Sequence, residues 1–228
     1  MDIYNLIVTN KFLLEVIYAF VLSLICLVIL FKTDRYFRLS LHSGLRYFRN
    51  AFLFYGLAFF WKFLFAEAIK LNDFQVPISQ FFFEYFLVMG GLFLLYSLIW
   101  KKFHTKPKVS SLFNSKISFL HLFATAIAII DCLIGKYFLL FTSQIIIFGL
   151  ASIIAFKNYK TKNKKSSFSR FYFLALLMGT IAWVLNFLTA FLFGWNIILL
   201  IDVGILNIIF FLLVLFGILK IIKQNSTI

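Results

Sequence analysis

Long apolar runs recur along the whole chain and are separated by short polar segments. They lie at approximately 10–31, 45–69, 77–100, 115–133, 137–156, 168–193 and 197–219. Each run is long enough to cross a hydrocarbon layer of ~30 Å as an α-helix. Strands with unpaired edges are not stable in lipid, so helices are the form available to these runs. The pattern predicts an all-α integral membrane protein, a single domain over residues 1–228 with seven transmembrane helices.

The composition agrees with a membrane location for these helices. Of 228 residues, 63% are hydrophobic and 13% are charged, whereas a soluble domain is ~45–50% apolar and ~25% charged. A water-soluble core of this length cannot bury so much apolar surface, and we therefore expect lipid to cover most of it. No hydrophilic stretch is long enough to fold as a second domain.

Positive charge is concentrated in every second connecting segment. Most of the 22 Lys and Arg residues follow the first, third, fifth and seventh runs. Because cytoplasmic loops carry an excess of Lys and Arg, the N-terminus is predicted outside and the C-terminus in the cytoplasm. We expect a multi-pass protein of the cell (plasma) membrane, with its basic loops near anionic lipid headgroups. The net charge of +14 lies mainly in these loops, and nucleic-acid binding is not expected.

The second run resembles the sixth under a constant shift in residue number. The shift aligns Arg46-Tyr47-Phe48 with Arg170-Phe171-Tyr172 and superposes the first run on the fifth. Small and polar positions coincide too. The same shift pairs Ala58 with Ala182, Phe59 with Trp183, and Lys62 with Asn186. The third run matches the seventh only when the connection before it is shortened, and Glu84 then pairs with Asp202. The pattern predicts a parallel 3+1+3 internal repeat, an arrangement known among transporters. Chance similarity between helices rich in Phe, Leu and Ala is the alternative.

Ionisable and amide side chains occur within six of the apolar runs at similar depths. With a rise of ~1.5 Å per residue, they lie about 7–10 Å below the outer surface. The set consists of Glu15, Lys62, Glu84, Gln144, Asn186 and Asp202, with Tyr55 on the same helix face as Lys62. Ionisable groups inside a membrane are costly, and they usually face a protein interior or a water-filled cavity.

This polar layer has two interpretations. In one it forms an outward-facing pocket for a small polar or cationic ligand, with Lys62, Glu84 and Asp202 as electrostatic anchors. Glu15, Gln144, Asn186 and Tyr55 would then complete the lining of that pocket. In the other, Lys62 pairs with Glu84 or Asp202 to hold the helices together, while Glu15 extends to the interface.

The remaining polar residues give little sign of chemistry. Glu67 and Asp131 are expected to be interfacial and solvated, and His121 to be a packing or hydrogen-bonding residue. Cys26 and Cys132 are expected to be small apolar fillers. Scattered His and Cys predict no metal and no haem or other cofactor. No nucleophile elbow, HExxH or Gly-rich phosphate loop occurs, so no catalytic residue is predicted and an enzyme is not favoured.

Similarities of topology identify no family. The arrangement resembles sugar carriers built from triple-helix bundles, but neither Pro77 nor Pro107 precedes a Gln, as their signature requires. It also resembles microbial rhodopsins, but the seventh run has no Lys before Lys220 to carry retinal. The leading hypothesis is a sensor- or receptor-like module that signals to a partner protein through its cytoplasmic loops. The alternatives are a small-solute transporter using the same site and a structural or assembly subunit of a membrane complex.

Overall fold

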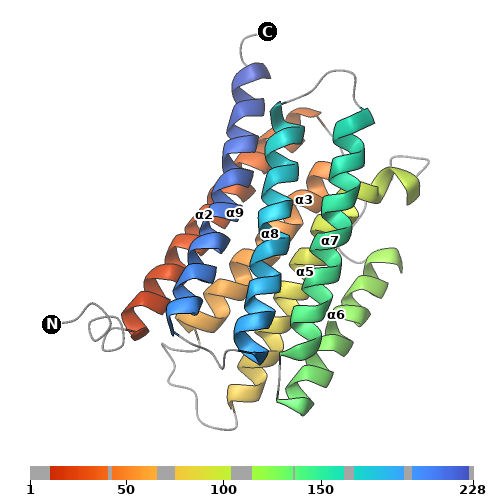
Figure 1. The fold of residues 1–228 in the computed structure, drawn as a ribbon. Helices are drawn as coiled ribbons and strands as arrows, with labels where there is room; N and C mark the ends of the chain where they lie inside the picture. Colours follow the sequence, from red (N-terminus) through yellow and green to blue (C-terminus); the bar gives the residue numbers. More distant parts are fainter. Residues whose placement is uncertain are drawn as a thin grey trace, which may run out of the picture.

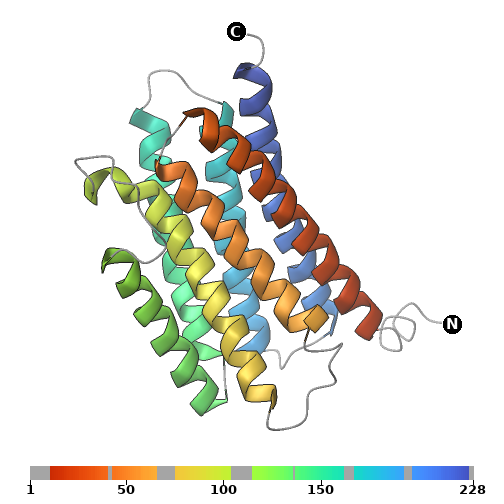
Figure 2. The ribbon, with the colours of Figure 1, turned by 180° about the vertical axis from the view of Figure 1, so that it is seen from behind.

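The computed structural model of this chain describes residues 11–40, 43–65, 75–103, 115–135, 137–161, 167–192 and 197–225. Over these ranges the regular structure is entirely helical (Figures 1 and 2). The elements are α2 (Lys11–Ser40), α3 (Ser43–Phe59), the π-helix η1 (Phe60–Phe65), α5 (Gln75–Phe103), α6 (Ser115–Ile134), α7 (Phe138–Thr161), α8 (Ser167–Phe191) and α9 (Ile197–Asn225). The prediction of an all-α protein is confirmed for the described residues.

Six of the helices are long and apolar enough to cross a membrane: α2, α5, α6, α7, α8 and α9. The second helix along the chain is divided, because the 17 residues of α3 run directly into the six residues of η1. These helices make the chain a multi-pass membrane protein.

The helix ends differ from the apolar runs in the sequence. Helix α2 continues to Ser40 and α9 to Asn225, beyond the predicted ends near 31 and 219. A helix continues into polar sequence wherever its backbone hydrogen bonds persist, and hydropathy marks only its apolar part. Helix η1 ends at Phe65, and the rest of the second predicted run, 66–69, lies outside the described residues.

Six helices form a closed ring, which we call the helix ring. Going round it, α2 packs against α3 with η1, α3 against α5, α5 against α7, α7 against α8, α8 against α9, and α9 against α2. Helix α6 lies outside this ring and packs mainly on α5 (Figure 2). The ring places three helices from the first half of the chain opposite three from the second half.

Aromatic side chains fill the middle of the ring. The ring of Tyr55 on α3 lies 5.8 Å from that of Phe211 on α9 and 6.5 Å from that of Phe148 on α7. Phe210 completes the group, 5.5 Å from Phe148. These separations are those of favourable edge-on and tilted aromatic pairs. We call these four residues the aromatic floor, because they join the two halves of the ring beneath the site described below.

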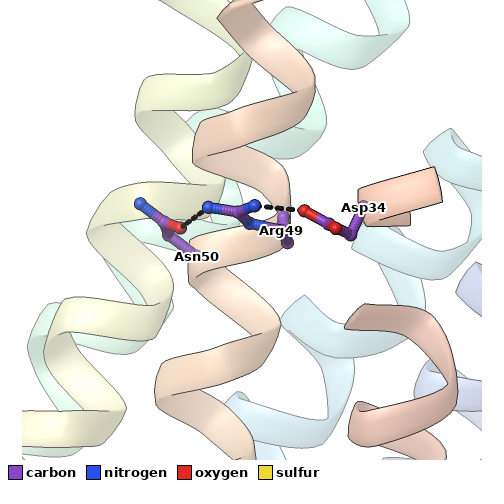
Figure 3. Close-up of polar contacts among 3 residues, drawn as sticks. All are labelled: Asp34, Arg49 and Asn50. Carbon is purple, nitrogen blue, oxygen red and sulfur yellow. Dashed lines mark hydrogen bonds and ion pairs between the residues drawn. The ribbon is translucent and has the colours of Figure 1, made fainter. Parts of the chain in front are cut away.

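A charged contact joins α2 and α3 at the end of the bundle away from that site. The Arg49 guanidinium donates to the Asp34 carboxylate, and a second Arg49 nitrogen lies 3.4 Å from Asn50 Oδ1 (Figure 3). Both charged side chains remain partly exposed, so the pair adds little to stability.

Candidate functional site

A central cavity of about 510 Å³ lies inside the helix ring. Side chains from α2, α3, η1, α5, α7, α8 and α9 line it, together with Tyr137 from the turn before α7. Helix α6 contributes nothing to this lining. The volume falls within the ~300–1,000 Å³ typical of small-molecule sites.

Polar groups are a minority of the cavity wall. They are Glu15, Tyr18, Tyr55, Lys62, Tyr137, Trp183, Asn186 and Asn207. The remaining lining is aliphatic, aromatic or glycine, and the aromatic floor closes the cavity toward the middle of the bundle. Four residues of the predicted polar layer are brought together here: Glu15, Tyr55, Lys62 and Asn186.

Lys62 projects from the π-helix into an aromatic and acidic environment. Its Nζ lies 4.2 Å from the centroid of the Phe83 ring and 5.2 Å from that of Tyr137. Glu15 and Glu84 are the acids that interact electrostatically with its ammonium. A π-helix widens one turn and is frequent at functional sites. The ring faces and the two acids favour the ammonium and so oppose the cost of burying it.

Glu84 is completely buried and does not line the cavity. Its Oε1 accepts a hydrogen bond of 2.7 Å from Gln80 Nε2, one turn earlier on α5. Its Oε2 has no hydrogen-bond partner among the residues that the structure describes. Phe83 and Leu87 of the same helix do line the cavity. Glu84 therefore lies behind the cavity wall and does not contact the cavity itself.

Gln144 and Asp202 also lie away from the cavity. Gln144 is buried between α7 and α5, where its Nε2 donates to the Leu87 carbonyl at 3.0 Å. A methyl group at Gly91 would lie 2.8 Å from Gln144 Oε1, so the two helices approach closely at this glycine. Asp202 is exposed on α9.

Asp131 is buried, and the expectation that it is solvated at the interface was wrong. Its carboxylate accepts hydrogen bonds from the backbone N–H groups of Leu139 at 3.0 Å and Leu140 at 2.6 Å. It therefore caps the N-terminus of α7 from the end of α6. Gly135 makes the geometry possible, because its φ of 69° turns the chain sharply between the two helices.

Other single residues behave as simple packing groups. The Tyr85 hydroxyl and His121 Nδ1 lie 2.6 Å apart, so the prediction of a hydrogen-bonding His121 is confirmed. Cys26 is buried, and Cys132 Sγ donates to the Pro77 carbonyl at 3.2 Å. In the described part of the chain, no three His, Cys, Asp or Glu side chains are grouped as metal ligands would be. Glu67 lies outside the described residues.

The predicted polar layer lacked two residues of the site. Asn207 Nδ2 donates to the Tyr18 hydroxyl at 3.0 Å and so joins α9 to α2. Tyr18 follows Glu15 by three residues and therefore shares its helix face. The spacing of Tyr18 from Glu15, and the amide of Asn207 in the middle of the seventh apolar run, were the sequence signals that could have identified these two residues.

Positions paired by the sequence shift meet at the same cavity. Lys62 and Asn186 both line it, and so do Phe59 and Trp183. The first member of each pair comes from the second helix along the chain and the other from α8. Two of the residue pairs predicted from the shift thus line one cavity.

No family model and no solved structure matches this chain. The chain is similar to an uncharacterised protein of Archaeoglobus fulgidus (strain ATCC 49558 / DSM 4304 / JCM 9628 / NBRC 100126 / VC-16). The two are 27% identical over 190 residues, which cover 78% of this chain and 80% of that protein. The description of that protein names no activity, and function has to be argued from the cavity.

Proposed function

We propose that this chain is a receptor-like membrane module that binds a small amphipathic molecule in its central cavity. The observation that carries this proposal is a cavity of about 510 Å³ walled by all six members of the helix ring. A molecule that touches every helix of a ring favours one packing of those helices over another. Binding in the cavity can thereby change the far ends of the helices, where a separate partner protein would respond.

The lining indicates the class of ligand. Aliphatic and aromatic walls suit an apolar body, and the hydroxyl and amide groups of Tyr18, Tyr55 and Asn186 suit a polar head. Lys62 and Glu15 line the same cavity, and their opposite charges compensate each other. A ligand charge would be a third charge, buried without a counter-charge. We therefore favour an uncharged single-chain amphiphile over the polar or cationic ligand expected from the sequence.

The proposal includes the orientation of the chain in the membrane. Seven crossings, with the N-terminus outside and the C-terminus in the cytoplasm of a cell membrane, place the basic segments on one side. The cavity then lies in the outer half, because Lys62, Tyr137 and Ile201 sit near the opposite helix ends. Arg49 and Asp34 mark the cytoplasmic half.

A transporter is the second candidate. The cavity lies where the two three-helix groups meet, and paired positions such as Lys62 and Asn186 line it from both sides. Parallel repeats that enclose a shared site are typical of some carriers. This function requires the aromatic floor to open, and accumulation of a small polar solute by proteoliposomes would establish it. An uncharged amphiphile partitions into lipid unaided, which favours a receptor for such a ligand.

A head-group comparison tests the proposed ligand class. Decanol, decanoate and decyltrimethylammonium share a ten-carbon chain and differ in charge. Each is added to protein in lipid nanodiscs, decanol below its aqueous solubility and the two ionic amphiphiles below their critical micelle concentrations. We expect decanol to raise the Tm of the wild type most. Glu15→Gln leaves Lys62 without its partner in the cavity and shifts the preference to decanoate. Lys62→Gln shifts it to decyltrimethylammonium.

Matched variants outside the cavity control this experiment. Asp202→Asn removes an exposed carboxylate and Lys157→Gln an exposed ammonium, and both retain the wild-type preference for decanol. Equal responses to the three amphiphiles in every variant would show that the cavity charges do not select a ligand, which contradicts the proposal.

A further inference from the structure

Among the described residues that line the central cavity, the exposed ones lie on α2 and α9. Leu14 and Ile17 on α2 are 41% and 49% exposed, and Ile205 on α9 is 51% exposed. Every other lining residue is buried or only partly exposed. Helices α2 and α9 run side by side in both views (Figures 1 and 2). The exposed lining therefore marks a mouth between these two helices.

This mouth faces lipid. Leu14 and Ile17 lie in the apolar span Leu13–Arg35, and Ile205 lies in the span Ile201–Lys220. All three side chains are aliphatic. They offer no hydrogen bond or charge to a solute that arrives from water. Glu15 follows Leu14 and Tyr18 follows Ile17, so these two polar residues of the cavity lie near the mouth.

We propose that the ligand enters and leaves the cavity sideways from the bilayer, through the mouth between α2 and α9. The proposal rests on the function proposed above and adds the route and the source of the ligand. An amphiphile dissolves in the bilayer with its chain among the acyl chains and its head near the interface. Moving sideways between two helices keeps its chain out of water throughout.

The hydrogen bond between Asn207 and Tyr18 lies across the seam between the two helices. The Tyr18 ring also packs against α9 at Gly204, where an added methyl would lie 3.6 Å from it. On its other side Tyr18 meets Phe59 edge-on at 6.0 Å. A single neutral hydrogen bond between transmembrane helices is weak. The bond between Asn207 and Tyr18, which we call the latch, can therefore break and re-form as the ligand passes.

Bulkier side chains at the mouth test the route. Ile17→Phe and Ile205→Phe narrow the mouth, whereas Leu24→Phe and Leu212→Phe enlarge exposed positions of α2 and α9 that do not line the cavity. The probe is a brominated long-chain alcohol, supplied from vesicles to protein in nanodiscs. Bromine quenches Trp183 in the cavity wall, and the signal is the quenching lost in Trp183→Phe.

We expect the two mouth variants to slow binding and release alike by about tenfold, since a barrier at a gate changes rates more than affinity. The two control variants keep the wild-type rates. Asn207→Leu removes the latch and speeds both steps. Wild-type rates in the mouth variants, with Trp183 still quenched, would overturn the lateral route and leave the ligand site standing. No quenching of Trp183 in the wild type would overturn the ligand site itself.

Discussion

At the scale of the residue, depth along a helix was predictable and direction around it was not. Fixed rise per residue placed Lys62, Glu84 and Gln144 in one layer. Only Lys62 of these three lines the cavity. Rotation about the axis is read from an apolar stripe, and helices that are apolar on all sides carry no such stripe. The polar layer could therefore be found from sequence, while the division into cavity wall and helix contact could not.

The burial of Asp131 was not predictable from the sequence either, and it leads to a prediction about stability. Its carboxylate is buried and caps two N–H groups of α7, so Asp131→Ala leaves those donors without partners in an apolar setting. Loss of a helix cap costs about 0.5–2 kcal/mol. Thermal unfolding in nanodiscs should show a lower Tm for Asp131→Ala. Asp202→Ala, which removes an exposed carboxylate, should leave it unchanged, and equal effects of the two would argue against the cap.

At the scale of the element, the apolar runs located each helix that the structure describes, because spanning length is a strong constraint. Their ends were less predictable: the sequence gives no hydropathy signal for the helical continuation of α2 to Ser40. The short gap between the predicted runs 115–133 and 137–156 contains Gly135, whose positive φ turns the chain between α6 and α7. The contact between α5 and α7 at Gly91 was not predictable from the apolar runs.

That contact gives a prediction with an internal control. Gly91→Ala places a methyl 2.8 Å from Gln144 Oε1, so Gln144 must move and its hydrogen bond to the Leu87 carbonyl weakens. Overpacking of this kind costs about 1–3 kcal/mol. Gly149→Ala, on α7 with open space around its added methyl, should be neutral or stabilising because alanine favours helix. Equal Tm values for the two variants would show that α5 and α7 do not pack as described.

At the scale of the whole molecule, the six-helix ring and its central cavity explain why polar residues from distant parts of the sequence share one layer. Glu15, Lys62, Asn186 and Asn207 come from four separate elements and meet at one cavity. The contacts repeat along the chain, α2–α3–α5 in the first half and α7–α8–α9 in the second. The proposed receptor function requires these two groups of helices to move against each other.

Occupation of the cavity is the central claim, and photo-crosslinking measures it most directly. The probe is decanol with a diazirine in its chain, illuminated with the protein in nanodiscs and mapped by peptide mass spectrometry. We expect adducts on cavity residues of both halves, such as Phe59, Trp183 and Phe211, and expect unlabelled decanol to compete for them. Adducts confined to outward-facing positions such as Leu24 and to α6, with no competition, would contradict the account.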